Sequence, residues 1–245
     1  MKKILGLVLC LCLLACEGGS KLAHEPLKME GETCDQCPDI QVEVPHMLDG
    51  SQVAEAINRA LSEEIISILS FSEGEPIDNV EKAIASFTQS YRELRDRFDY
   101  ELPWEASVKG RVVHEDERIV TLEVNSYSFT GGAHGYASTS YLNFDKKNGR
   151  ELDNVELFSD LPGFQELVEA RFREQEKIPA QGNINATGFM FEGDSFHLPL
   201  NIGYTENGLR LLYNQYEVAS YADGPIELIL PYEGANPFLR HKVKH

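Results

Sequence analysis

A glycine-rich loop with one histidine is the first segment whose residues could do chemistry. It reads GGAHG at residues 131–135 and lies between two strand-like segments. Gly131 and Gly132 permit positive φ angles and a close backbone approach, so the loop can turn sharply and present amide groups. His134 could act as a base or a ligand there. A lone histidine is more often a structural hydrogen-bonding residue, and both interpretations stay open.

A tyrosine-rich segment is the second candidate. Tyr213, Tyr216 and Tyr221 follow a strand-like run. Tyrosine suits recognition surfaces because one end of its side chain is apolar and the other polar. It suits equally the packing of a loop over a sheet, which is the commoner use. We take Gly131, Gly132, His134, Tyr213, Tyr216 and Tyr221 as the candidate binding residues.

Neither a catalytic set nor a metal site is expected. A catalytic metal needs about three protein ligands, and the other histidines show no ligand-type spacing. The sequence contains no His-Glu-x-x-His, nucleophile-elbow or P-loop pattern. Glu115 and Glu117 could suggest the two carboxylates of a glycosidase, but that assignment depends on the distance between the carboxyl groups, which the sequence does not give. We therefore expect no cofactor.

The first residues predict export and lipidation. Lys2 and Lys3 precede an apolar run that ends at Ala15, directly before Cys16. The run is too short to span a bilayer and typical of a secretory signal peptide. Its end resembles a lipobox, so we expect a signal peptide over residues 1–15 and a lipid on Cys16. The protein would then be lipid-anchored in the cell envelope, in the periplasm or at the cell surface, with the choice of membrane left open.

The remaining cysteines predict a local disulfide. Of the five cysteines, only Cys34 and Cys37 remain after cleavage and lipidation. Outside the cytoplasm such a pair is expected to be oxidised. A thioredoxin-type redox site is the alternative, and Pro38 excludes haem attachment because that motif needs histidine there. We place the pair in a lipidated tether, residues 16–37, whose first part reads as flexible.

The charge of the chain limits its partners. The chain has 40 acidic and 22 lysine or arginine residues, a formal charge of −18. Loss of Lys2 and Lys3 with the signal peptide takes this charge to −20. A nucleic-acid partner is not expected, because phosphate binding needs the opposite sign. A cationic protein is an electrostatically suitable partner, although the charge also serves solubility alone.

Apolar periodicity predicts an α+β fold with two lobes, antiparallel sheets and helices packed on one face. An N-terminal lobe spans residues 38–150 and a C-terminal lobe residues 151–240. The tail after residue 240 is basic and expected to fray. We expect helices over residues 51–70, 79–98 and from 162, and strands over residues 40–44, 107–114, 118–129, 136–145, 195–204, 209–213 and 225–232.

Several short motifs together resemble a family of paired extracytoplasmic domains of unknown function, the RsiV/PdaC type. The motifs are YSFTGGAH (127–134), LNFD (142–145), GREL (149–152), LF (157–158), GLRLLY (208–213), YEVASYADG (216–224) and LPY (230–232). The resemblance covers about residues 38–240. It implies a two-lobed α+β fold and a binding module at the cell envelope, since such domains occur in a lysozyme-sensing anti-sigma factor and ahead of a peptidoglycan deacetylase.

We therefore expect a stand-alone bacterial lipoprotein that acts as a non-enzymatic binding module. A lysozyme-like cationic protein or a cell-wall component such as peptidoglycan is the expected partner. The alternative is a peptidoglycan-modifying enzyme or accessory subunit with His134 in a cleft.

Overall fold

A six-stranded sheet forms the larger part of the computed structural model, which describes residues 21–70, 76–98 and 102–244. Its strand order follows the chain. All neighbouring strands are antiparallel except β2 and β3, which are parallel because two helices connect them. The strands are β1 (His24–Glu30), β2 (Asp39–Met47), β3 (Glu105–Glu115), β4 (Ile119–Phe129), β5 (Tyr136–Asp145) and β6 (Arg150–Glu151).

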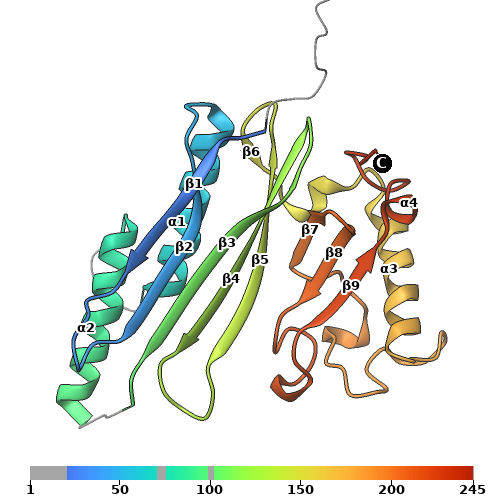
Figure 1. Ribbon diagram of the computed structural model, residues 1–245. Helices are drawn as coiled ribbons and strands as arrows, with labels where there is room; N and C mark the ends of the chain where they lie inside the picture. The colour runs from blue at the N-terminus through green and yellow to red at the C-terminus, as the bar shows by residue number, and fades with distance from the viewer. Residues whose placement is uncertain (1–20, 71–75, 99–101, 245) are drawn as a thin grey trace, which may run out of the picture.

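Helices α1 (Gln52–Leu69) and α2 (Val80–Phe98) cover one face of this sheet (Figure 1). Their apolar sides pack on the buried side chains of β2, β3 and β4, and these residues form the first hydrophobic core. The N-cap of α1 is Ser51, whose hydroxyl accepts a hydrogen bond from the Ala54 amide. The apolar periodicity read from the sequence located both helices.

A three-stranded antiparallel sheet lies against the other face of the large sheet. It consists of β7 (Asn201–Thr205), β8 (Gly208–Tyr213) and β9 (Ile226–Leu230). Helix α3 (Leu161–Gln175) covers its far side and short α4 (Tyr232–Ala235) follows β9 (Figure 1). A second hydrophobic core lies between this sheet and α3. The α+β class is thus confirmed, and the lobe boundary expected at residues 150 and 151 falls within β6.

The strand predictions are wrong at two places: one strand was missed and another was extended too far. Residues 24–30, expected in a flexible tether, form β1, which escaped detection because an exposed edge strand carries few apolar residues. Residues 195–200 alternate apolar and polar but form no strand. Leu200 is 77% exposed, and side chains bind this stretch instead: Gln165 donates to the Phe196 carbonyl, and Glu217 accepts from the Leu200 amide.

The C-terminal tail is also ordered up to residue 244, contrary to the expectation of fraying. The Asn236 side chain pairs with both backbone groups of Val243, at 2.9 and 3.0 Å. The Arg240 amide donates to the Leu157 carbonyl, and its side chain donates to the carbonyls of Glu156 and Phe158. These bonds satisfy free carbonyls of an adjacent loop, which a sequence pattern cannot reveal.

The two sheets meet where β7 crosses β4 and β5. Thr121 donates to Asn143, and the Asn143 side chain donates to the Ile202 carbonyl, at 2.9 and 2.8 Å. Gly203 lies against the Tyr141 ring, and a β-carbon there would overlap with the atoms of that ring. The close approach of the sheets at this point therefore requires glycine.

Replacement of Gly203 by alanine tests this contact. Because Tyr141 is buried, we expect the added methyl group to lower the free energy of unfolding by about 1–3 kcal/mol. Gly50→Ala is the control, since a β-carbon there meets nothing within 4 Å. Urea unfolding measures both variants, and equal stability of the two would show that the sheets do not approach this closely.

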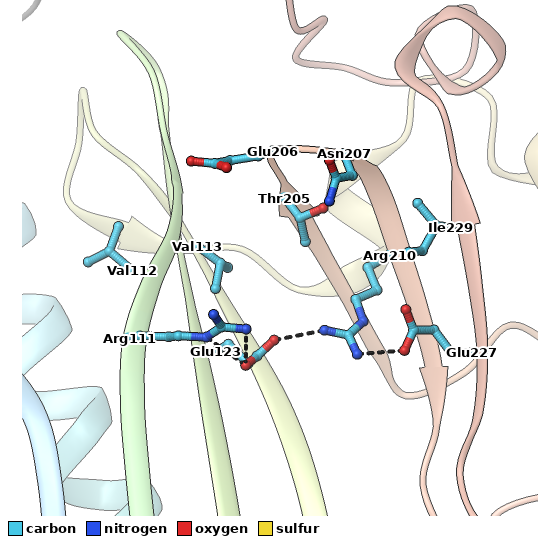
Figure 2. A pocket seen from close by; sticks show the side chains of 10 residues that line it. All are labelled: Arg111, Val112, Val113, Glu123, Thr205, Glu206, Asn207, Arg210, Glu227 and Ile229. Carbon is cyan, nitrogen blue, oxygen red and sulfur yellow. Dashed lines mark hydrogen bonds and ion pairs between the residues drawn. The ribbon is translucent and has the colours of Figure 1, made fainter.

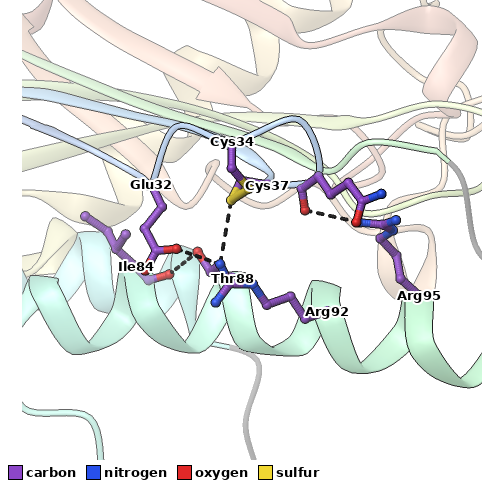
Figure 3. Close-up of a disulfide and its surroundings, with 8 residues drawn as sticks. Glu32, Cys34, Cys37, Ile84, Thr88, Arg92 and Arg95 are labelled. Carbon is purple, nitrogen blue, oxygen red and sulfur yellow. Dashed lines mark hydrogen bonds and ion pairs between the residues drawn. A yellow bond between two sulfur atoms is a disulfide. The ribbon is translucent and has the colours of Figure 1, made fainter.

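The disulfide Cys34–Cys37 closes the β1–β2 connection and lies over α2 (Figure 3). Arg92 of α2 contacts the Cys37 sulfur at 3.7 Å and forms a 2.6 Å ion pair with Glu32. Arg95 donates to the Gln36 carbonyl at 3.2 Å. The cysteine pair thus belongs to the folded domain rather than to a tether, and it joins the β1–β2 connection to α2.

A modest stabilisation is expected from this disulfide. Its loop is short, so the chain entropy that it removes from the unfolded state is worth about 2 kcal/mol at most. Cys34→Ser with Cys37→Ser should lower the free energy of unfolding by no more than this and leave the helix content unchanged. Urea unfolding of oxidised, reduced and double-serine protein measures it, and a far larger loss would contradict the entropic account.

Candidate functional site

The two candidate loops meet at one end of the molecule. The β4–β5 loop carries His134, and the β8–β9 connection carries Tyr216 and Tyr221. The His134 ring stacks on Tyr221 with centroids 3.7 Å apart, and the Tyr216 hydroxyl lies 3.3 Å from His134 Nε2. Tyr216 and Tyr221 also touch each other, with centroids 5.7 Å apart. We call His134, Tyr216 and Tyr221 the aromatic surface.

This surface is open to solvent. Tyr216 is 55% exposed, and His134 is exposed as well. Tyr127 and Tyr136, at the ends of β4 and β5 beside the loop, are 36% and 44% exposed. Exposed tyrosines that lie this close together form the kind of amphipathic patch that is enriched at protein interfaces.

The β4–β5 loop depends on its glycines. Gly131 and Gly132 have φ angles of 107° and 88°, which residues with a β-carbon rarely adopt. A β-carbon at Gly135 would lie 2.5 Å from the Tyr127 ring. The candidate residues Gly131 and Gly132 therefore shape the loop that presents His134.

The β8–β9 connection is held in place by hydrogen bonds to its polar side chains. The Asn214 side chain pairs with the amide and carbonyl of Thr139 in β5, at 2.9 and 3.0 Å. The Glu217 carboxylate accepts from the Asn214 and Leu200 amides, at 2.9 and 2.8 Å. Tyr216 adopts a φ of 68°, a strained conformation for a tyrosine that these contacts maintain. The aromatic surface is thereby ordered in advance of any binding.

Tyr213 does not belong to this surface, so its inclusion among the candidate binding residues is wrong. It is fully buried, and its hydroxyl donates to the His197 carbonyl at 2.6 Å. Burial raises the pKa of its phenol. Tyr213 packs at the end of β8 in the second core and supports the connection that carries the other two tyrosines.

A polar cleft between the sheets is a feature that the sequence did not reveal (Figure 2). It has a volume of about 350 Å³ and opens between β3 and the β8–β9 pair. Glu123 lies at its base with a side chain only 4% exposed. Its carboxylate pairs with Arg111 at 2.9 Å and with Arg210 at 3.0 Å, and Arg210 also pairs with Glu227.

Glu123 is the centre of this ionic network. Burial alone would raise the pKa of its carboxyl group, but hydrogen bonds from Asn125 and Arg111 and the charge of Arg111 together hold that pKa below its ordinary value. Tyr141 donates to the same carboxylate at 3.1 Å, and burial and the Glu123 charge raise the pKa of that phenol. Glu123 is therefore an ionised group that links the two sheets.

The sequence did contain part of the signal for this network. Thr121 and Glu123 alternate with the apolar residues of β4, a pattern that places their side chains on the opposite face of the strand from Val120, Leu122 and Val124. They do face away from the first core, but the second sheet covers them, at 0% and 3% exposure. The presence of Glu123 in an otherwise apolar strand was the one feature of the sequence that indicated an internal ion pair.

Other candidate residues lie apart from these two features. Glu115 forms an ion pair with Lys146 at 2.7 Å, with both side chains largely buried. Within the described residues, no group of three or more histidine, cysteine, aspartate or glutamate side chains is placed to hold a metal ion. Among the same residues, no helix is long and apolar enough to cross a membrane. The predicted signal peptide and Cys16 lie outside the described part of the chain.

Comparison with known families adds to this geometry. A family model described as deacetylase PdaC matches residues 32–137, and one described as a protein of unknown function, DUF3298, matches residues 156–233. The chain has PdaC/DUF3298-like paired domains. The resemblance read from the short motifs is thus confirmed. The aromatic surface joins the two regions, since His134 lies in the PdaC-like region and Tyr216 and Tyr221 in the DUF3298-like region.

Solved structures share the fold. A DUF3298 family protein from Pseudomonas aeruginosa PAO1 is 22% identical with a TM-score of 0.64, and the match covers 91% of this chain and 97% of that one. A DUF3298 family member from Bacteroides fragilis NCTC 9343 is 18% identical with a TM-score of 0.67, covering 92% and 95%. No curated protein matches the chain significantly.

Proposed function

We propose that this protein is a lipid-anchored envelope protein that acts as a non-enzymatic binding module, and that its aromatic surface contacts a cationic, lysozyme-like protein. The observation that carries the proposal is the convergence of His134, Tyr216 and Tyr221 from two distant loops on one exposed patch. Tyrosine is among the residues that most often dominate the binding energy of protein interfaces.

The environment of His134 favours recognition over acid–base chemistry. Its Nδ1 lies 3.1 Å from the Gly135 carbonyl, and its Nε2 lies beside the Tyr216 hydroxyl. The ring face is occupied by Tyr221. These contacts orient the imidazole as part of a flat aromatic group, which suits packing against a partner.

The charge of the chain supports a cationic partner. A formal charge of −18 attracts basic proteins over long distances and accelerates their encounter with the surface. Such steering falls with ionic strength, because salt screens charges beyond about 10 Å. Short-range packing on the tyrosines would then determine how long the complex lasts.

Binding of lysozyme to the mature, lipidated protein in detergent micelles tests the proposal. We expect saturable binding with an association rate that falls steeply as ionic strength rises. Succinylated lysozyme is the matched control, because each modified lysine then ends in a carboxylate and the charge of the protein is reversed; circular dichroism checks that its fold is retained. An absence of binding by native lysozyme at both low and physiological ionic strength would refute the proposed partner.

A further inference from the structure

The end of the molecule opposite the aromatic surface carries a cluster of basic side chains. The β3–β4 hairpin and the C-terminal tail enclose a pocket of about 570 Å³ there. Arg118, Arg240, Lys242 and Lys244 line it, together with the carboxylates of Glu115, Asp116 and Glu117. Lys146 pairs with Glu115, so positive side chains exceed carboxylates among the residues around this pocket. That excess is contrary to the charge of −18 for the whole chain.

The basic residues of the tail are held in position. The Asn236 side chain pairs with the amide and the carbonyl of Val243. These two bonds hold the backbone in place between Lys242 and Lys244. Both lysines are exposed, as is Arg118 on the hairpin. We call Arg118, Lys242 and Lys244 the basic rim.

The described chain also begins at this end. The Leu22 amide donates to the Glu115 carboxylate at 2.8 Å, in the wall of the same pocket. Five residue steps separate Lys21 from Cys16. A fully extended chain advances at most about 3.6 Å per residue, so Cys16 would lie within about 18 Å of Lys21, which directly precedes the residue bound to the pocket wall.

We propose that the basic rim docks on the surface of a membrane containing anionic phospholipids. This inference rests on the proposed lipid anchor and not on the proposed partner. Clustered basic residues near a membrane anchor each contribute attraction to anionic headgroups. The short distance between Cys16 and Lys21 raises the local concentration of headgroups around the rim, so even a few charges suffice for docking.

Docking in this orientation directs the aromatic surface away from the membrane. Strand β4 runs from the β3–β4 hairpin to the β4–β5 loop, and its 11 residues span about 35 Å. The β8–β9 connection lies at the same far end as that loop (Figure 1). The membrane thus receives one end of the molecule, and a soluble partner has free access to the other.

Fluorescence quenching on vesicles tests the orientation. A dye on Asn148→Cys, in the β5–β6 turn near the rim, or on Ala133→Cys, in the far loop, reports distance to lipids with a quencher on the headgroup. With lipidated protein, we expect stronger quenching at Asn148→Cys in vesicles of phosphatidylcholine with phosphatidylglycerol than in phosphatidylcholine alone. Ala133→Cys should show the reverse change, and added salt should remove both.

Charge-neutralised variants locate the effect. Lys242→Gln with Lys244→Gln should lower the docking equilibrium constant by roughly 20- to 30-fold. Lys28→Gln with Lys109→Gln removes the same charge from exposed strand positions elsewhere and should leave docking unchanged. Quenching that is independent of phosphatidylglycerol, or equally affected by both variants, would overturn the proposal. Mass spectrometry that finds no lipid on Cys16 would overturn it as well, without bearing on the aromatic surface.

Discussion

Glu123→Gln should lower the free energy of unfolding by about 2–4 kcal/mol. The carboxylate is buried between two arginines, and neutralising it leaves Arg111 and Arg210 facing each other without their shared partner. The cost falls mainly on Arg210, which is only 26% exposed and keeps Glu227 as its one charged partner, whereas solvent reaches the 66% exposed Arg111. Urea unfolding at neutral pH measures the loss.

The pH dependence of this effect has a defined sign. The pKa of Glu123 is lower in the folded protein than its ordinary value of 4.5. Its contribution is therefore complete above about pH 4.5 and disappears as the pH falls through the lower, folded-state pKa. The stability difference between wild type and Glu123→Gln should be constant at neutral pH and shrink in acid.

An exposed ion pair provides the control for Glu123→Gln. Glu43 pairs with Lys28 at 3.0 Å, but their side chains are 50% and 63% exposed. Glu43→Gln should cost less than about 1 kcal/mol, since solvent screens such pairs. If Glu123→Gln were as mild as Glu43→Gln, the network at the base of the cleft would not join the sheets as described.

Tyr216→Ala and Tyr221→Ala should each weaken lysozyme binding by about 30-fold or more, while leaving the fold intact. Each substitution removes a large aromatic ring from the centre of the proposed interface, where truncation typically costs 2 kcal/mol or more. The three side chains touch one another, so the double variant should lose less than the product of the single effects. Titration calorimetry or interferometry measures the affinities.

Leu200→Ala is the control for the tyrosine variants. Leu200 is the most exposed of the large apolar side chains among the described residues, and only its backbone amide contacts the β8–β9 connection, through Glu217, so truncation of the side chain leaves that hydrogen bond in place. Its truncation should change affinity less than about threefold, as for most exposed positions. Wild-type affinity in both tyrosine variants would place the binding site elsewhere.

Local patterns in the sequence identified most of the helices and strands. The apolar faces of α1 and α2 and the alternation in β4 follow directly from the sequence, because each is a short-range period. Strand β1 was missed because an edge strand without a buried face has no such period. Residues 195–200 have the period but no neighbouring strand, so their backbone groups bind side chains instead.

The candidate site shows the same limit. Composition and glycine content marked the loops that carry His134 and Tyr216, but their contact joins residues that are 82 positions apart. Only the packing of one sheet on the other brings them together. The Glu123 network depends on the same packing, since Arg111 and Arg210 reach Glu123 from different sheets. Tyr213 was assigned wrongly because a tyrosine at the end of a strand looks alike in sequence whether it is buried or exposed.

Hydrogen–deuterium exchange of the lipidated protein with and without lysozyme tests the central claim most directly. We expect slower exchange on binding in residues 130–136 and 214–222, the two segments that carry the aromatic surface, with the basic end unaffected. Protection confined to other segments, such as those lining the cleft between the sheets, or no protection at saturating lysozyme, would contradict the assignment of the aromatic surface as the binding site.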